Sequence, residues 1–294
     1  MARVILQNKT LKIPDSKRAL ESSGRSILIK MSKVIYCSDL HGNKTVYKKL
    51  FEKAKDKDIK AIIIGGDICP HFRGPIEMGI KVQREFLTDY LIPRIKQFGK
   101  EVFVMMGNDD FSVNMDVLVE AEKNKILKLL HFRLHELGKF KLIGYSFVPP
   151  MPFLLKDWEK LDDENSEHIT DPEMDIRTVK KEEGTIEEDF KEIKKMSNAK
   201  ETIYVIHSPP FGTKLDMTLR EEHVGSKAIK DFIKKEQPPL TLHGHIHEGP
   251  ETGSWKDNIK NTLCINPGSS YLKSMLNIVV ISIDNPKKAE YLVV

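Results

Sequence analysis

Residues 34–42 read Val-Ile-Tyr-Cys-Ser-Asp-Leu-His-Gly, and this short stretch decides the fold class. Its apolar beginning is typical of a buried strand, and Asp39 and His41 follow two residues apart. Side chains of an extended segment alternate between faces, so we expect both to lie on one side of the strand end. Open α/β sheets bind ligands there. Taken alone, the pair also fits a second interpretation, with Asp39 as a turn residue and His41 as a helix cap.

The same pattern recurs four times downstream, and the repetition favours a metal site. Each further apolar run leads into polar residues: 61–64 into Asp67, 102–106 into Asn108, 202–206 into His207, and 240–242 into His245 and His247. Oxygen and imidazole donors without a cysteine thiolate suit Mn, Fe, Zn or Ni. A carboxylate able to bridge suggests two ions about 3.5–4 Å apart. The residues alone therefore predict a two-metal hydrolytic site.

The segments between these runs indicate an α/β arrangement. Asn43 is a plausible N-cap for a helix, and the strand, helix, strand order predicts parallel pairing. A second helix is predicted over 77–98, with Pro93 kinking or splitting it. Thr185 and Ser226 are predicted to cap two further helices. Short strands at 128–130, 132–134 and 139–146 require a second sheet, and residues 278–283 with 291–294 predict a closing hairpin.

Composition describes an ordinary globular protein. Of 294 residues, 40% are hydrophobic and 31% charged, and no apolar run approaches the roughly 18 residues that cross a bilayer. The net charge of +4 comes from interleaved basic and acidic residues, which argues against a nucleic-acid stripe. Three scattered cysteines predict no disulfide framework. Residues 1–10 lack the features of a secretory signal, so we expect a cytoplasmic location without membrane attachment.

Domain organisation is predicted from changes in pattern. Residues 1–30 show no clear period and are interpreted as an N-terminal extension of unknown role. Residues 31–294 then form a single domain. Within it, residues 149–200 are highly charged and begin with several prolines, which indicates an insertion or a lid.

The ordered blocks resemble the signature of the calcineurin-like metallophosphoesterases: D-x-H, G-D, G-N-H-(D/E), H and G-H-x-H. The resemblance spans residues 34–268, and the Asn266–Ser269 turn is also common in smaller members. It implies a four-layer α/β/β/α sandwich of two mixed β-sheets. By the family's pattern, Asp39, His41 and His247 hold one divalent ion, Asn108, His207 and His245 hold the other, and Asp67 bridges them. Manganese is favoured.

The implied activity is hydrolysis of a small phosphoester by attack of a metal-bridging hydroxide. One block departs from the signature, because Asp109 stands where the family usually carries a catalytic histidine. An anionic Asp109 facing the substrate would reverse the local charge and favour monoanionic diesters, so we expect a phosphodiesterase. Two alternatives remain: a non-catalytic protein-interaction scaffold of the same fold, and a nuclease.

Several further residues are candidates for contact with the substrate. Asn108, His71 and Arg73 could contact its phosphate, although the latter two also fit a polar loop. His243 could contact the ligands or the substrate, or bind a metal directly. Cys69 is interpreted as a redox-sensitive thiol or, more simply, as a packing residue. His131 and His135 have helical ligand spacing, but their surroundings favour strands.

Overall fold

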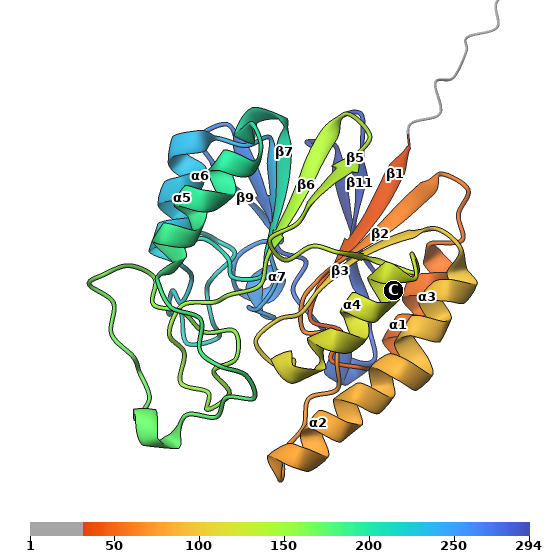
Figure 1. The fold of residues 1–294 in the computed structure, drawn as a ribbon. Helices are drawn as coiled ribbons and strands as arrows, with labels where there is room; N and C mark the ends of the chain where they lie inside the picture. The colour runs from red at the N-terminus through yellow and green to blue at the C-terminus, as the bar shows by residue number, and fades with distance from the viewer. Residues whose placement is uncertain (1–31) are drawn as a thin grey trace, which may run out of the picture. The chain divides into compact units, whose positions relative to one another are not determined.

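The computed structural model describes residues 32–294, which form two six-stranded sheets with helices outside them (Figure 1). Each sheet contains both parallel and antiparallel pairs. The predicted four-layer sandwich of two mixed sheets is therefore confirmed. The predicted extension, residues 1–30, lies outside the described residues.

The first sheet has the strand order β12-β11-β1-β2-β3-β4. Its parallel strands are β1 (Lys33–Cys37), β2 (Ile59–Gly65), β3 (Glu101–Met105) and β4 (Lys128–Leu129). The predicted closing hairpin is present, because β11 (Asn277–Ser282) pairs antiparallel with β12 (Ala289–Val293) and with β1. The carboxyl ends of β1, β2 and β3 therefore meet at one edge.

The second sheet has the order β5-β6-β7-β8-β10-β9. Its strands are β5 (Leu134–Leu137), β6 (Phe140–Tyr145), β7 (Thr202–Ile206), β8 (Leu240–Leu242), β9 (Lys256–Ile259) and β10 (Thr262–Ile265). The central strands β6, β7, β8 and β10 are parallel. Two predictions are corrected here: residues 128–129 pair with the first sheet, and 132–133 form no strand because Phe132 adopts a left-handed turn (φ 51°).

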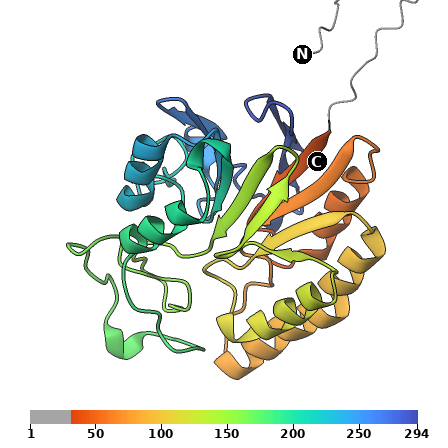
Figure 2. The same cartoon turned by 45° about the horizontal axis from the view of Figure 1, so that its top comes forward.

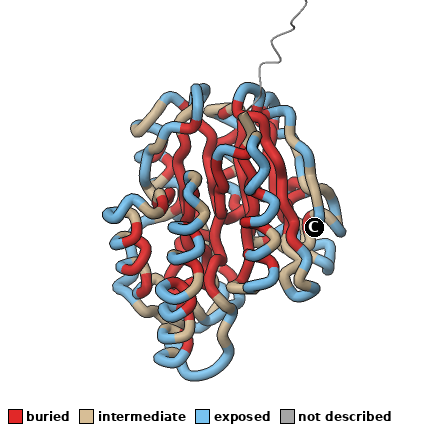
Figure 3. Tube along the Cα trace, turned by 90° about the vertical axis from the view of Figure 1, so that its right-hand side faces the viewer, coloured by how far each residue is buried: buried red, intermediate tan, exposed pale blue. Residues whose placement is uncertain are grey.

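Alternation along each strand produces the layers. In β1, Val34 and Tyr36 belong to an apolar cluster drawn from strands of both sheets, which fills the space between them. Ile35 and Cys37 belong to a second cluster shared with the helices. The strands accordingly form a buried centre, and the helices outside them expose one face (Figure 3). Both faces of the central strands are therefore apolar, as their continuous hydrophobic runs predict.

Helices cover the outer face of each sheet (Figures 1 and 2). On the first sheet lie α1 (Lys44–Lys53), α2 (Ile76–Glu85), α3 (Ile92–Phe98) and α4 (Met115–Lys123); on the second lie α5 (Ile186–Met196) and α6 (Lys227–Glu236). The predicted caps are confirmed: the side chains of Asn43, Thr185 and Ser226 each accept a hydrogen bond from the first turn of a helix. A short helix, α7 (Gly249–Thr252), follows β8.

The helix predicted over 77–98 is continuous but changes its winding before Pro93. A π-helical segment, Phe86–Leu91, joins α2 to α3, and the Ile92 N–H donates to Leu87 O. A proline lacks the N–H of a regular turn. The π-helical segment has a wider turn than an α-helix and accommodates the missing N–H without interrupting the helix. Pro93 therefore neither splits nor ends the helix.

The charged segment 149–200 has two parts with different surroundings. Its end contains α5. Ile186, Phe190 and Ile193 of this helix are buried in the second apolar cluster, the one shared between the strands and the helices. Its beginning is irregular and is bound to the loop after β3, because Trp158 Nε1 donates to Asp110 O (3.0 Å). A lid could therefore involve only the residues between these anchors. No helix within residues 32–294 is long and apolar enough to cross a membrane.

Candidate metal centre

The seven predicted metal ligands come from five loops at the carboxyl ends of strands. Asp39 and His41 follow β1, Asp67 follows β2, Asn108 follows β3, His207 follows β7, and His245 and His247 follow β8. Both sheets thus contribute ligands. Contacts between the loops join all seven residues into one cluster.

Asp39 and His41 reach the cluster for a reason that differs from the predicted strand alternation. β1 ends at Cys37, and both residues adopt left-handed backbone conformations, with φ of 58° and 41°. Their N–H groups donate to Gly66 O (3.0 Å) and Asp67 O (2.9 Å). Hydrogen bonds therefore join the loop after β1 to the loop after β2. These bonds, and not an extended strand, turn the side chains of Asp39 and His41 inward.

Asp67 (φ 48°) and His245 (φ 66°) are also left-handed. This conformation costs a residue with a Cβ roughly 1 kcal/mol or more, and such strain concentrates at functional sites. Four of the seven predicted ligands share it. The surrounding contacts therefore hold the cluster in a geometry that the isolated loops would avoid.

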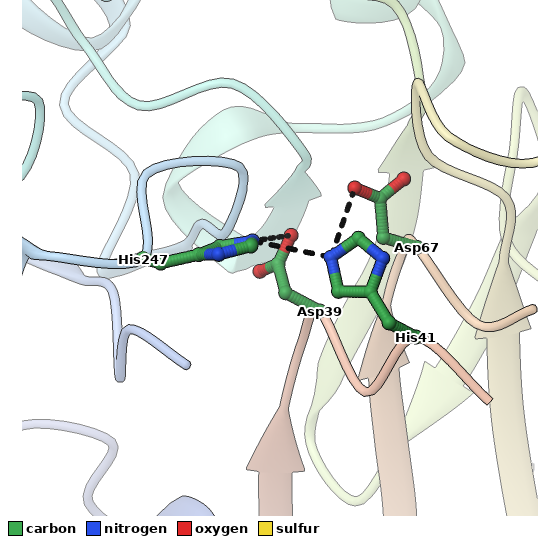
Figure 4. Close-up of side chains that lie close together, drawn as sticks. All are labelled: Asp39, His41, Asp67 and His247. Atoms are coloured by element: carbon green, nitrogen blue, oxygen red, sulfur yellow. Dashed lines mark hydrogen bonds and ion pairs between the residues drawn. The ribbon is translucent and has the colours of Figure 1, made fainter. Parts of the chain in front are cut away.

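Four side chains form one half of the cluster (Figure 4). One ligand atom from each of Asp39, His41, Asp67 and His247 lies within 4.8 Å of the others. The Nε2 atoms of His41 and His247 are 3.2 Å apart. His41 Nε2 lies 3.7 Å from Asp67 Oδ2, and His247 Nε2 lies 3.6 Å from Asp39 Oδ1. These atoms point at one common volume.

The other half centres on the Asn108 amide oxygen. His207 Nε2 lies 3.1 Å and His245 Nδ1 lies 2.5 Å from Asn108 Oδ1. His207 Nδ1 donates a hydrogen bond to Gly65 O (2.8 Å). That contact directs Nε2 toward Asn108, and in the neutral ring Nε2 is the nitrogen available to a metal ion.

The electrostatics of the cluster fit a cation. Asp39 and Asp67 are buried carboxylates, and such charges require a compensating positive charge. Burial lowers the pKa of His41, but Asp109, Asp67 and Asp39 outweigh it and raise that pKa to about 9. Burial likewise lowers the pKa of His207, yet Asp67 and Asp39 raise it to about 9. The donor types and the charge of the site therefore both suit divalent ions.

Gly107 allows close approach at the centre of the cluster. A Cβ at this position would lie 2.4 Å from Asp67 Oδ1 and 2.6 Å from His207 Nε2. Any side chain would therefore displace two predicted ligands. This steric requirement explains the glycine before Asn108.

The Asn266 turn holds the loop that carries His245 and His247. The buried Asn266 Nδ2 donates to Gly244 O (3.0 Å), Ile246 O (2.9 Å) and Leu215 O (3.2 Å). Ser269 N donates to His247 O at 3.1 Å. The turn therefore fixes the backbone on both sides of His245.

Asp109 does not present a free carboxylate to the substrate. Its Oδ2 lies 2.5 Å from His71 Nδ1 and 3.3 Å from His41 Nδ1. Burial raises the pKa of Asp109, but the adjacent imidazoles of His41 and His71 outweigh it and hold that pKa below its usual range. The predicted charge reversal at this position stays a prediction, and the structure adds that the carboxylate is paired with the His71 imidazole.

His243 is fully buried and supports the backbone on both sides of the predicted ligand His207. Its Nδ1 faces Ile206 O (3.1 Å) and Ser208 O (2.9 Å), and its Nε2 faces Thr241 Oγ1 (2.8 Å), so the structure agrees with contact to the ligands and not with direct binding of a metal. Both ring nitrogens are therefore used inside the fold.

Three other candidates lie outside the cluster. Cys69 is buried, and burial raises the pKa of its thiol well above the usual value, as expected of a packing residue. His131 Nδ1 accepts from Ser146 N, and His135 Nε2 lies against Leu129 O.

Two residues at the site, Tyr271 and Gln83, were not predicted from the sequence. The Tyr271 ring lies 4.3 Å from the His41 ring and 5.8 Å from the His247 ring, measured between centroids. Gln83 on α2 is fully buried and bonds to both loops that carry His71 and Asp109. A polar residue on the buried face of a predicted helix was the available signal for Gln83. No sequence pattern marks Tyr271.

A family model described as calcineurin-like phosphoesterase matches residues 32–249. The chain therefore belongs to this family, whose members hydrolyse phosphate esters and generally use divalent metal ions. No curated protein matches the sequence significantly.

Solved structures share the fold at low sequence identity. One crystal structure matches with a TM-score of 0.64 and 19% identity, covering 89% of this chain and 98% of the other. TT1561 of Thermus thermophilus matches with a TM-score of 0.59 and 14% identity over 89% and 98% of the two chains. A dimetal phosphatase from Danio rerio matches with a TM-score of 0.56 and 10% identity over 86% and 92%. These likenesses establish the fold.

Proposed function

We propose that this protein is a phosphodiesterase that uses two divalent ions, with manganese favoured. Asp39, His41 and His247 would hold one ion, and Asn108, His207 and His245 the other. The observation that carries the proposal is the position of Asp67. Its Oδ2 lies 3.7 Å from His41 Nε2, and its Oδ1 lies 3.6 Å from His207 Nε2, so one carboxylate faces both sets of donors.

When bound, two divalent ions would activate water and polarise the phosphate oxygens. The chain's own residues hold the carboxylates of Asp67 and Asp39 in place. The Asp109 N–H donates to Asp67 Oδ1 (2.8 Å), and the His245 N–H lies 3.1 Å from both oxygens of Asp39. These contacts fix the two carboxylates before substrate arrives, which is how preorganised sites avoid rearrangement during reaction.

The preference for diesters is supported by the charge at the rim of the site. Asp109 is anionic there and pairs with His71, because its contacts with His41 and His71 hold its pKa below its usual range. The Arg73 guanidinium beside His71 then supplies one positive charge to the substrate, which matches a monoanionic diester. A dianionic monoester would leave one negative charge unmatched.

The direct test compares two substrates with the manganese-loaded full chain. We expect a higher kcat/KM for bis(p-nitrophenyl) phosphate than for p-nitrophenyl phosphate. A clear preference for the monoester would overturn the diester assignment. Failure to hydrolyse any phosphodiester, phosphomonoester or cyclic nucleotide would overturn the catalytic proposal and favour the scaffold.

A further inference from the structure

His71 and Asp109 form a pair beside the candidate metal centre. His71 Nδ1 lies 2.5 Å from Asp109 Oδ2, and the same oxygen lies 3.3 Å from His41 Nδ1. The rings of His71 and His41 are 6.4 Å apart between centroids. The Asp109 carboxylate thus lies between His41, a predicted metal ligand, and the more exposed imidazole of His71.

Gln83 holds together the two loops that carry His71 and Asp109. Gln83 Nε2 donates to Pro70 O (3.2 Å), next to His71, and to Asp109 O (2.8 Å), and its Oε1 accepts from Phe111 N (2.8 Å). One buried side chain therefore ties the loop after β2 to the loop after β3. This fixed spacing makes the contact between His71 and Asp109 a property of the fold and not a chance meeting of surface groups.

The outer side of His71 remains accessible. Its side chain is 42% exposed, compared with 24% for Asp109. Arg73 Nε donates to His71 Nε2 at 3.5 Å, the limit of a hydrogen bond. A guanidinium and an imidazole brought this close can both contact one anion.

We infer that His71 contacts the phosphate of the substrate through Nε2, and that Asp109 orients it. This inference rests on the proposed function. The imidazole absent from position 109 is thereby supplied from the neighbouring loop, and Asp109 is a positioning residue. Arg73, whose Nε lies 3.5 Å from His71 Nε2, would contact the same phosphate.

A purely structural role for His71 makes a different prediction. If the imidazole only supported Asp109, and through it His41, the Nδ1 side of the ring would suffice. If it contacts the substrate, the Nε2 side is essential. Two substitutions separate these roles, since the amide nitrogen of asparagine can replace Nδ1 and that of glutamine can replace Nε2.

The experiment uses the manganese-loaded full chain and His71→Asn, His71→Gln and, as a control, His223→Asn. His223 is similarly exposed (34%) and pairs, at 2.8 Å, with the buried Asp216 outside the site. We measure kcat and KM for bis(p-nitrophenyl) phosphate, bound metal, and the affinity for inorganic phosphate by calorimetry. We expect His71→Asn to lower kcat/KM about 10- to 100-fold and to weaken phosphate binding, with bound metal unchanged.

His71→Gln should keep several-fold more activity than His71→Asn, and His223→Asn should match the wild type. Wild-type kinetics and phosphate affinity in His71→Asn would overturn the inference, as would losses that simply follow loss of metal. An inactive wild type would refute the proposed function instead, and phosphate affinity would then still decide the role of His71.

Discussion

His131 is a half-buried histidine that the proposed chemistry does not use. It packs edge-on against Phe132, Phe147 and Trp158, and its Nδ1 accepts from Ser146 N (3.0 Å). Burial, aided by Lys160 and Arg133, lowers its pKa to about 3. The folded protein therefore holds this ring neutral at pH values where an exposed histidine is charged.

This depressed pKa predicts acid sensitivity. Below pH about 6.5 the unfolded chain binds a proton that the folded chain refuses, so the stability contributed above that pH is lost as the pH falls toward 3. The loss is about 2 kcal/mol between pH 7 and pH 5. His131→Asn keeps an acceptor for Ser146 N but cannot titrate. Urea unfolding at both pH values should show a smaller loss for the variant, and equal losses would contradict this account.

Tyr271 shows what a single residue adds without belonging to any motif. Its ring covers His41 and approaches His247, and it follows the turn that begins at Asn266. The turn therefore serves two purposes: Asn266 fixes the histidine loop, and the residues after it form part of the rim.

At the scale of elements, the turn after β10 is predicted to be essential to the site. Asn266→Asp would replace a donor that serves three carbonyl oxygens by a carboxylate that repels them. We expect a loss of about 2–4 kcal/mol in the free energy of unfolding, together with weaker metal binding. Asn261→Asp is the matched control, because Asn261 is exposed and its amide bonds only to Gln237 Oε1 (3.0 Å) among the hydrogen bonds in residues 32–294. Equal effects of both substitutions would refute the assigned role.

The charged segment after β6 is anchored at points that a lid would need to leave. Asp157 accepts from Ser112 N (2.8 Å) and from Thr178 N (2.6 Å), and Lys156 N donates to Ile176 O (2.8 Å). The buried ion pair of Lys156 with Glu159 (2.6 Å) adds a further constraint. Movement, if the segment is a lid, is therefore confined to residues 163–175 and 179–184.

The anchors predict different results for a short replacement and for a long deletion in this segment. We expect replacement of residues 164–174 by a short Gly-Ser linker to change KM and substrate preference while leaving bound metal and the unfolding transition nearly unchanged. Deletion of 157–183 should instead destabilise the fold, because it removes Asp157 and Trp158 from the loop after β3. Unchanged kinetics across several substrates in the shorter replacement would show that the segment is no lid.

At the scale of the whole molecule, the sandwich brings distant parts of the sequence together. The sheets lie face to face, and the loops of β1, β2 and β3 meet those of β7 and β8 at one edge. Asp39 and His247, more than 200 residues apart, come within 3.6 Å. Neither sheet alone would complete the cluster.

Much of this arrangement could be predicted from sequence because buried strands and their polar ends form a simple repeating pattern. The caps at Asn43, Thr185 and Ser226 were predictable because each satisfies a local hydrogen-bonding need. The left-handed geometry of Asp39 and His41 was not, since it depends on hydrogen bonds to a loop that follows another strand. The pairing of Asp109 with His71, 38 positions away, likewise depends on tertiary contacts.

The measurement that tests the central claim most directly is the metal content of the purified wild type and Asp67→Asn after manganese loading, with circular dichroism as the check on folding. Asp67 faces both donor groups, and the asparagine amide offers one oxygen without a charge. We predict two ions per wild-type chain, loss of most bound metal and nearly all hydrolysis in the variant, and unchanged dichroism. A folded variant that keeps two ions and full activity would contradict the assignment of the site.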